Sequence, residues 1–409
     1  MLRLLPAVVA FLSFTQGAVS LRPQHHTRAA HDLTIRADAL ASAKADVESF
    51  LGSDKGDMIR SAMFSSIRTS WEQGTAAGGV LEYDNPEYSV FGSAPFSNNG
   101  AETPLIPLQF ALSAAVRQTA DGRLSQNIGD ALDGAALDGA SSGSVVLMGT
   151  FTDVDRKEYW ANASARELDY VLNVAPRTST GAISHRADSK QYWADGVYMG
   201  FPFIAYYGAV TSNQTLLQIA YDQCRLYRDA LLIDGPTGKL WAHIYDDSTK
   251  TWSDEGIWGT GNAWAALGIL RVAVTIEKTE HAQHMTNQTT ELYAWVKEIL
   301  DGEFAAINDD NLFPDYITGG PNFSDAATSA ALASVAFRAA TLHPETFGLN
   351  YTLKADKVRQ AVLDNLTELG TISPIVDPLV WDQVGTLSTE SQAFGLMMVA
   401  AWRDWVFPL

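Results

Sequence analysis

The sequence has 409 residues, of which 46% are hydrophobic and 18% are charged, a composition typical of a soluble protein with a large core. Its net charge is −19 and it contains no basic run, which disfavours nucleic acid and anionic membrane surfaces as partners. It contains one cysteine, Cys224, so an internal disulfide bond is excluded.

Residues 1–20 have the pattern of a secretory signal peptide. Arg3 precedes a short apolar run over residues 4–14, and a small-residue cleavage site follows. No later segment approaches the about 18 unbroken apolar residues of a membrane-spanning helix. We therefore expect a secreted, extracellular protein with a leader over residues 21–38 and a single domain over residues 39–409.

Glycosylation is the second sign of secretion. One N-x-S/T sequon is weak evidence, but six behind a signal peptide indicate a glycosylated exoprotein. The asparagines expected to carry glycans are Asn162, Asn213, Asn287, Asn322, Asn350 and Asn365.

Most of the remaining chain predicts α-helices of two alternating kinds. Amphipathic helices are indicated where apolar positions recur at i, i+3, i+4 and i+7, over residues 159–174, 215–232 and 291–304. Nearly uncharged segments rich in Gly, Ala and Ser predict helices that are buried on all sides. These lie at residues 71–83, 136–151, 195–210, 260–274, 326–340 and 389–402. Residues 239–247 predict a short strand or hairpin arm.

The buried helices recur at a nearly fixed spacing. The markers near their starts, 57 to 67 residues apart, are Trp71, Asp138, Asp195, Asn262, Thr328 and Ser391. Six buried and six amphipathic helices predict an all-α fold, a closed (α/α)6 toroid with an inner and an outer ring. An open α-solenoid is the alternative, but its inner helices line a groove and carry more charge than these do.

Polar and aromatic residues gather where the buried helices begin. Asp138 precedes the second, Trp193 and Asp195 precede the third, and Trp258 and Trp264 flank the start of the fourth. In a ring these helix starts face one end, where their unpaired N–H groups and dipoles attract anions. Aromatic rings beside carboxylates indicate sugar binding.

The loops that lead into these helices add positive charge. Residues 176–190 contain Arg177, His185, Arg186 and Lys190, and the segment over 239–247 contains His243. Each candidate also has a structural interpretation: an Asp is a favoured helix N-cap, and a Trp is often part of a core. The sequence contains no metal-binding, nucleotide-binding or nucleophile-elbow motif, so we expect no cofactor and no metal.

These segments resemble glycoside hydrolase families 88 and 105, the six-hairpin unsaturated uronyl hydrolases, and family 105 is the more similar. The segment "LNVAPRTSTGAISHRADSKQYWADGVYMGFPFIAYYG" contains a W-x-D-x-x-x-M motif at Trp193, Asp195 and Met199. The segments "LDGASSGSVVLMGTF", "GKLWAHIYDD" and "WGTGNAWAALGIL" follow the family pattern in the expected order. The resemblance covers about residues 60–405.

The resemblance implies a substrate and a catalytic group. Enzymes of this kind act on oligosaccharides that carry a 4,5-unsaturated uronic acid left by polysaccharide lyases. By resemblance, Asp195 protonates C4 and then activates the water that adds at C5, while Asp138 positions the substrate or tunes Asp195. Apolar neighbours and a second carboxylate are expected to raise the pKa of Asp195.

The local charge, the aromatic clustering and the resemblance together predict a set of residues in contact with substrate. They are His185, His243, Trp193, Trp258, Trp264, Arg186, Lys190, Thr260, Asn262 and Met199. Two positions depart from the family pattern: the family's Arg is Thr260 here and its second Gly is Ala263. Arg177, Arg186 or Lys190 would have to replace the lost charge.

Two other functions remain open on the same sequence. One is an exo-glycosidase that removes a saturated uronide, such as glucuronic acid. We retain this alternative because Thr260 stands where the family has an Arg near the substrate. The other is a non-catalytic carbohydrate-binding protein in which Asp138 and Asp195 are helix caps. In each case we expect a monomer that binds an oligosaccharide.

Overall fold

The computed structural model describes residues 40–98, 100–126 and 134–408. The chain divides into two compact units, Met1–Ser42 and Ala43–Leu409, and the larger is described here by itself. The predicted signal peptide and leader lie outside the described residues.

Two sets of helices make up this unit. The inner helices are α3 (Trp71–Asp84), α5 (Gly143–Thr152), α7 (Gly196–Met199) with α8 (Phe201–Val210), α10 (Gly259–Glu277), α12 (Ala326–Leu342) and α14 (Thr389–Val406). The outer helices are α2 (Lys55–Ser66), α4 (Leu105–Val116), α6 (Lys157–Asp169), α9 (Gln214–Leu231), α11 (Thr286–Phe304) and α13 (Leu349–Asp364). Among the described residues, no helix is both long enough and apolar enough to cross a membrane.

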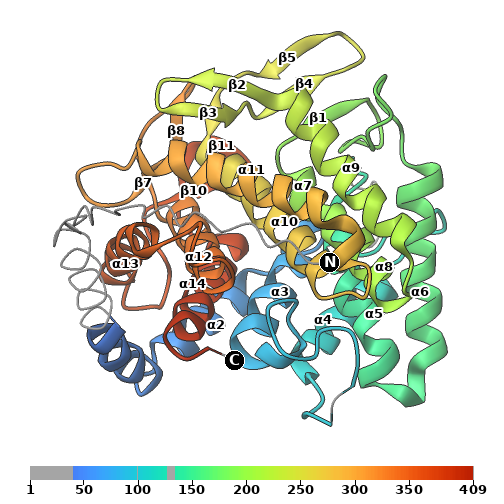
Figure 1. The fold of residues 1–409 in the computed structure, drawn as a ribbon, viewed down its shortest axis with the longest axis horizontal. Helices are drawn as coiled ribbons and strands as arrows, with labels where there is room; N and C mark the ends of the chain where they lie inside the picture. Colours follow the sequence, from blue (N-terminus) through green and yellow to red (C-terminus); the bar gives the residue numbers. More distant parts are fainter. Residues whose placement is uncertain (1–39, 99, 127–133, 409) are drawn as a thin grey trace, which may run out of the picture. The chain divides into compact units, whose positions relative to one another are not determined.

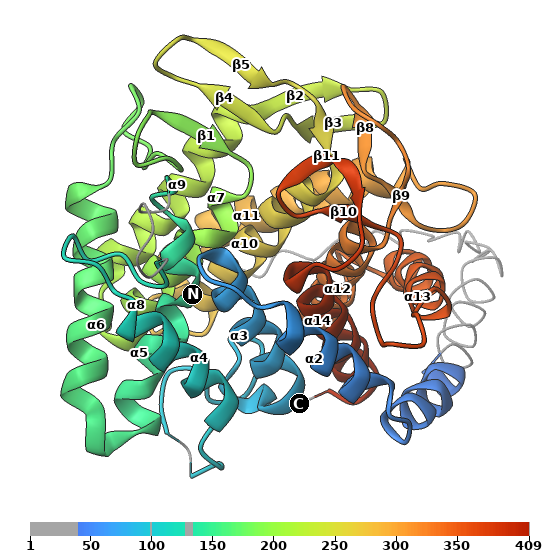
Figure 2. The same cartoon turned by 180° about the vertical axis from the view of Figure 1, so that it is seen from behind.

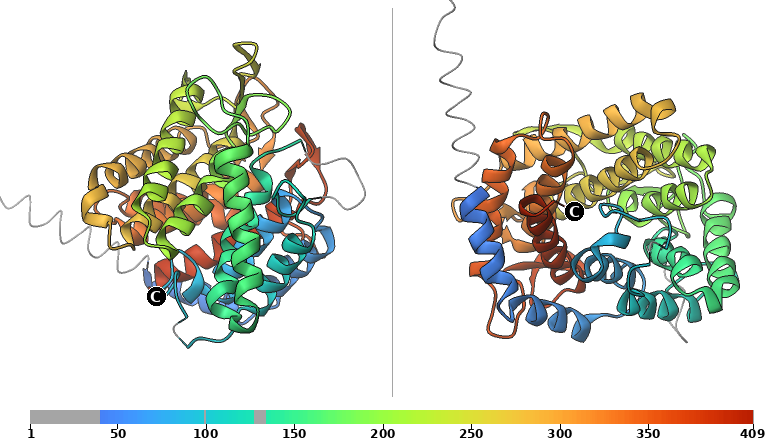
Figure 3. Two further views of the ribbon diagram at one scale, coloured as in Figure 1. Left: turned by 90° about the vertical axis from the view of Figure 1, so that its right-hand side faces the viewer. Right: turned by 60° about the horizontal axis from the view of Figure 1, so that its bottom comes forward.

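The inner helices form a closed ring. Each packs on the next in chain order, and α14 packs on α3, so the last and first inner helices meet. Each inner helix also packs on the outer helix that follows it, and α2 covers α14. In the right-hand view of Figure 3 the colours run in chain order around the unit. The (α/α)6 toroid predicted from the sequence is confirmed, and the open solenoid is excluded by the contact between α14 and α3.

Three predicted helices differ in detail from the observed ones. The segment predicted at 136–151 begins as a 3₁₀ helix, η2 (Asp138–Ser142), before α5. The segment predicted at 195–210 divides into α7 and α8, with Gly200 between them and Pro202 in the first turn of α8, where a missing N–H has no cost. The segment predicted at 159–174 is α6 followed by a π-helical turn at Tyr170–Val174.

Short strands connect the helices, mostly at one side of the ring, at the top of Figures 1 and 2. They are β1 (Gln191–Trp193), β2 (Leu232–Gly235), β3 (Gly238–Trp241), β4 (Ile244–Asp246), β5 (Thr251–Asp254), β6 (Ile257–Trp258), β7 (Phe313–Pro314), β8 (Tyr316–Thr318), β9 (Ser324–Asp325), β10 (Ile375–Asp377) and β11 (Val380–Gly385). β1, β4 and β5 form one antiparallel sheet, and the other strands pair in twos. β1, β6, β9 and β11 directly precede inner helices, so these strands fix where the helices begin.

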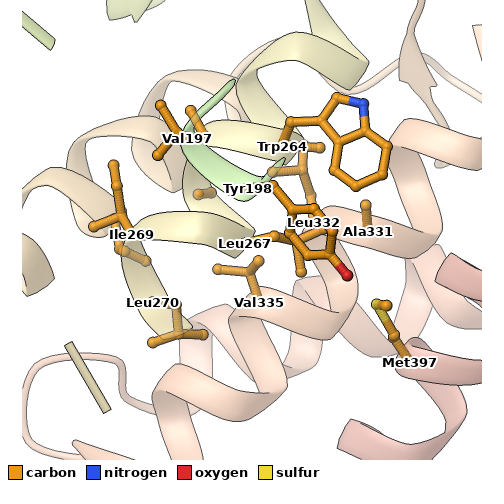
Figure 4. Packing of buried hydrophobic residues seen from close by; sticks show 14 of the residues in the cluster. Val197, Tyr198, Trp264, Leu267, Ile269, Leu270, Ala331, Leu332, Val335 and Met397 are labelled. Carbon is orange, nitrogen blue, oxygen red and sulfur yellow. The ribbon is translucent and has the colours of Figure 1, made fainter. Parts of the chain in front are cut away.

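The core lies between the inner helices. Figure 4 shows Tyr198 of α7 beside Trp264 of α10, whose ring centroids are 4.7 Å apart. Gly268 lets α10 approach the backbone of α7 closely, because a Cβ atom there would lie 2.3 Å from the carbonyl oxygen of Val197. The position of α7, and with it the residue before α7, is therefore set by direct helix contact.

Buried ion pairs connect the other ends of the inner helices. Glu82 near the end of α3 accepts from Arg271 of α10 and, at 3.1 Å, from Arg338 of α12. Arg338 also contacts Asp404 of α14 at 2.5 Å. All four side chains are less than one-tenth exposed, so this network is mostly shielded from solvent, and it ties four inner helices together.

Candidate active site

A cavity of about 150 Å³ lies where the inner helices begin. Its walls come from the first turns of several inner helices, from the loop before β1, from the turn between β3 and β4, and from the β10–β11 hairpin. The lining residues are Trp71, Ala135, Asp138, His185, Arg186, Trp193, Asp195, Met199, His243, Trp258, Trp264, Pro378, Leu379, Trp381 and Glu390. Nine of the twelve residues predicted from the sequence for catalysis and substrate contact are among them.

Asp195 lies between β1 and α7 and points into this cavity. It occupies the position before the first residue of α7, but its side chain accepts no capping hydrogen bond from that helix. Its Oδ2 atom lies 3.4 Å from Nε2 of His243, and its side chain is 15% exposed. The helix-cap interpretation of Asp195 is therefore wrong, and its carboxylate is available to a ligand.

His243 is held in place from its other side. The backbone N–H of Ala194 donates to the carbonyl of His243, which aligns the turn after β3 with Asp195. Nδ1 of His243 lies 2.9 Å from Oδ2 of Asp254, and the hydroxyl of Tyr316 donates to the same oxygen at 2.6 Å. The backbone N–H of Gly256 donates to Oδ1 of Asp254. A continuous chain thus runs from Tyr316 through Asp254 and His243 to Asp195.

These contacts of Asp195 and His243 contradict the expectation that the pKa of Asp195 is raised. Burial alone would raise its pKa, but the close contact with His243 and its charge, together with the charge of His185, outweigh burial and lower it. Burial alone would lower the pKa of His243, but its contact with Asp195 and its hydrogen bond to Asp254 raise it. The prediction of a raised pKa for Asp195 is therefore wrong for the protein without substrate: the contacts of Asp195 favour its carboxylate form, and those of His243 favour its protonated form.

Asp138 forms the second acidic position. It is the first residue of η2, and its Oδ1 atom lies 3.6 Å from Nε2 of His185. Ser70, just before α3, donates to Oδ2 of Asp138 at 3.2 Å. Each of the two cavity aspartates is thus paired with one histidine, Asp138 with His185 and Asp195 with His243.

Aromatic rings form the walls around these pairs. Trp193 stacks on His185, with ring centroids 4.9 Å apart and an interplanar angle of 23°, and the guanidinium of Arg186 lies 5.9 Å from the Trp193 centroid. Trp381 meets Trp193 edge to face at 5.7 Å, and Trp258 lies 4.4 Å from His243. The cavity therefore combines flat apolar surfaces with charged groups, as a sugar acid requires.

Three residues predicted to contact substrate lie outside the lining. Lys190 is exposed. Asn262 is fully buried, and its side-chain amide bonds the backbone of Trp241 and Trp258, which fixes the start of α10. Thr260 is fully buried and donates to Asp325 at 3.1 Å. Asn262 and Thr260 therefore support the backbone behind the cavity and do not contribute to its surface.

The position of Thr260 bears on the charge expected from the family pattern. Of the three cations proposed to replace the missing Arg, Arg186 lines the cavity. Arg177 donates instead to backbone carbonyls at residues 172 and 181, and Lys190 is exposed. Arg186 is therefore the candidate among the three because it alone of them lines the cavity, although its guanidinium also donates to Asp188.

Among the residues that sequence reasoning missed, four matter to the chemistry of the site: Glu390, Trp71 and Trp381 in the lining, and Asp254 behind His243. Nε1 of Trp71 donates to Oε2 of Glu390 at 2.8 Å, so the starts of α3 and α14 meet at the cavity. Trp71 was recognised as a helix start and Glu390 lies in a polar helix start, and that common position was a signal that could have found both. Nothing in the sequence places Trp381 or Asp254 there.

The described residues contain no cluster of three or more His, Cys, Asp or Glu side chains arranged to hold a metal ion. Cys224 is buried in α9, where burial raises the pKa of its thiol, and it lies outside the cavity.

The comparison with protein families decides the class of this chain. Residues 111–368 match the model of Glycosyl Hydrolase Family 88, which is more than half of the sequence. The chain belongs to this family. It is a glycoside hydrolase, and the resemblance to families 88 and 105 is confirmed.

Individual relatives of the family 88 chain agree with this class. An unsaturated rhamnogalacturonyl hydrolase of Bacillus subtilis (strain 168), YesR, is 23% identical over 258 residues, which cover 62% of this chain and 70% of that protein. A possible member of family 105 from Klebsiella pneumoniae has a TM-score of 0.66 at 15% identity, covering 88% of this chain and 94% of the other. An unsaturated glucuronyl hydrolase from Bacillus sp. GL1 has a TM-score of 0.59 at 13% identity, covering 86% and 96%.

Proposed function

We propose that this family 88 hydrolase removes a 4,5-unsaturated uronic acid from the non-reducing end of oligosaccharides produced by polysaccharide lyases. The observation that carries the proposal is Asp195, an uncapped carboxylate in an aromatic cavity, in contact with His243. The relatives named for unsaturated rhamnogalacturonyl and glucuronyl hydrolysis support the choice of substrate class.

The charges of the cavity suit a substrate that is an anion. His185, Arg186 and His243 line the same side as Asp195 and can bind the carboxylate on C5 of the uronate. The bound carboxylate adds negative charge beside Asp195, which raises the pKa of Asp195, and His243, 3.4 Å away, is the donor from which Asp195 takes up its proton. Substrate binding thus prepares the acid that the reaction needs.

The reaction then uses one carboxyl group twice. Asp195 gives its proton to C4, the electrons of the C4=C5 bond form the new C–H bond, and the ring oxygen stabilises the cation left at C5. Water adds at C5 and gives a proton back to Asp195. The resulting hemiketal opens by breaking the bond between C5 and the ring oxygen, and C1, now a hemiacetal, releases the next sugar. This differs from the usual glycosidase mechanism, in which two carboxyl groups both act at C1.

The Asp195→Asn variant tests this mechanism. We expect loss of the ultraviolet absorbance of the C4=C5 bond in lyase-generated oligosaccharides to slow by about 10²–10⁴-fold, since the group that moves the proton is gone. Asp229→Asn, at an exposed position on α9, is the matched control and should retain full activity. Activity of a folded Asp195→Asn variant within a few-fold of the unaltered protein would exclude Asp195 as the acid.

One observation favours a second candidate, an exo-glycosidase acting on saturated uronides. Three carboxyl groups, those of Asp138, Asp195 and Glu390, line one cavity, and hydrolysis at C1 needs two. Release of saturated glucuronic acid without any loss of double-bond absorbance on unsaturated substrates would establish this candidate in place of the first.

We also propose that the enzyme is secreted and glycosylated. The support is the pattern of residues 1–20 and the exposure of all six sequon asparagines, namely Asn162, Asn213, Asn287, Asn322, Asn350 and Asn365. Expression in a eukaryotic host should place the protein in the medium with a mass that falls on treatment with an N-glycosidase. Retention of the whole chain in the cells would contradict the proposal.

A further inference from the structure

The wall of the cavity that lies opposite Asp195 has its own carboxyl group, Glu390. Glu390 is in the first turn of α14, is 3% exposed, and lines the cavity. In the order of the six inner helices, α14 lies three places from α7 in either direction, so the starts of α7 and α14 face each other across the ring. Oε2 of Glu390 accepts from the indole N–H of Trp71 at 2.8 Å, which fixes the carboxyl group in the wall.

The two walls differ in charge. The cations that line the cavity, His185, Arg186 and His243, belong to the wall of the loop before β1 and the β3–β4 turn. The wall formed by α3 and α14 contributes only aromatic and acidic side chains from the described residues, Trp71 and Glu390. An anion on that side would therefore meet no positively charged side chain among the described residues of the lining.

The charges around Glu390 are themselves mostly negative. Burial raises the pKa of Glu390 to about 8; the hydrogen bond from Trp71 opposes this, and the charges of three nearby carboxylates add to it. The three are Glu72 of α3, Asp195 before α7 and Asp325 before α12. Arg68 is the cation nearby, but its guanidinium is bound to Glu72 and does not line the cavity. At neutral pH Glu390 is therefore a protonated carboxyl group that can donate a hydrogen bond to a sugar oxygen.

The chemistry of the sugar ring places the leaving group at this wall. In a six-membered uronate ring C1 lies across from C4 and C2 lies across from C5. When C4, C5 and the carboxylate face Asp195 and the cationic wall, the 2-hydroxyl group and the oxygen on C1 face Glu390 and Trp71. We propose, on the basis of the proposed function, that Glu390 and Trp71 form the subsite for this side of the substrate and that it selects a neutral leaving sugar over an anionic one.

Two disaccharides with the same unsaturated uronate test this subsite. One carries rhamnose, which is neutral, and the other carries a sulfated hexosamine. The ratio of their kcat/KM values cancels the titration of Asp195 and His243, because both substrates use the same acid. We expect the unaltered protein to favour the neutral leaving sugar by about tenfold or more at neutral pH.

The pH dependence of this ratio identifies Glu390. Between about pH 6 and about pH 9 Glu390 becomes charged, so the preference for rhamnose should rise several-fold further in the unaltered protein. In Glu390→Gln, which keeps an acceptor for Trp71 and cannot ionise, the ratio should not change with pH. Glu167→Gln is the matched control: Glu167 is a buried carboxyl in α6 whose pKa is also raised to about 8, outside the cavity, and its variant should behave like the unaltered protein.

The outcomes separate this inference from the proposed function. A ratio of one or less, or a ratio in the unaltered protein that is independent of pH, overturns the subsite while the proposed function stands. No loss of the double bond in either disaccharide overturns the proposed function, and the subsite with it.

Discussion

The Asp254→Asn variant tests whether the proton on His243 matters for the reaction. Asp254 accepts from Nδ1 of His243 at 2.9 Å, and the His243 side chain is 1% exposed, so the charge of Asp254 acts with little screening by solvent. Asparagine keeps the shape and one acceptor oxygen but removes the charge. We expect His243 to lose its proton at lower pH, so the alkaline limb of kcat/KM against pH moves to lower pH.

The size of the shift follows from the hydrogen bond that changes. A hydrogen bond to a charged group contributes about 1.5–3 kcal/mol, and a free energy of about 1.4 kcal/mol equals one pH unit. The alkaline limb should therefore move by about one to two pH units. At low pH, where His243 is protonated in both proteins, the two rates should approach each other.

The assay is the loss of double-bond absorbance on a lyase-generated oligosaccharide, measured across the pH range. Tyr316→Phe removes only one donor to Asp254 and should shift the limb less. Asp247→Asn alters a buried carboxylate just after β4 that binds Ser179 and Lys250 away from the cavity, and it should not shift the limb. An unchanged limb in a folded Asp254→Asn variant would refute the role of His243 as the source of the proton.

Three further variants test other features of the structure. Trp193→Ala removes a wall of the cavity and should raise KM about tenfold with a smaller effect on kcat; equal effects on both would contradict a binding role. Arg338→Met leaves Glu82 and Asp404 without their shared partner, and chemical denaturation should show a loss of about 3–5 kcal/mol; a neutral effect would mean the network is unimportant. Glu303, whose carboxyl oxygens have no hydrogen-bond partner among the described residues, has a pKa raised by burial well above its ordinary 4.5. The contribution of Glu303 to the free energy of unfolding is complete below about pH 4.5, where the group is protonated in both the folded and the unfolded chain, and it is lost as pH rises toward the raised pKa. Tm should therefore fall less between acid and alkaline pH in Glu303→Gln than in the unaltered protein.

The helical ring was predictable from the sequence because its pairs of inner and outer helices repeat. Nearly uncharged segments at a nearly fixed spacing indicate buried helices, and the observed inner helices begin at or close to the markers of those segments. The position of Asp195 followed from the same spacing. The strand or hairpin arm predicted over residues 239–247 is confirmed by β3 and β4. Strands such as β1 and β6 were not predictable, because they have two or three residues each, too few for an alternating pattern.

The electrostatics of the site depend on contacts that no local pattern contains. The sequence places Asp195 among apolar neighbours, which predicts a raised pKa, but the structure adds His243 from 48 residues later in the chain. Asp254 reaches His243 only because β5 folds back on β4. Glu390 and Trp71 are 319 residues apart and meet because the ring closes.

The closing contact between α3 and α14 also has a consequence for synthesis. Trp71 leaves the ribosome early, whereas Glu390 is added when nearly the whole sequence has been made. Until α14 docks against α3, the wall opposite Asp195 does not exist and the inner helices on either side of the gap expose apolar surface. A growing chain therefore has its acid and its histidines before it has a complete cavity, and a chain that stops short of α14 should be inactive even when it keeps every residue around Asp195.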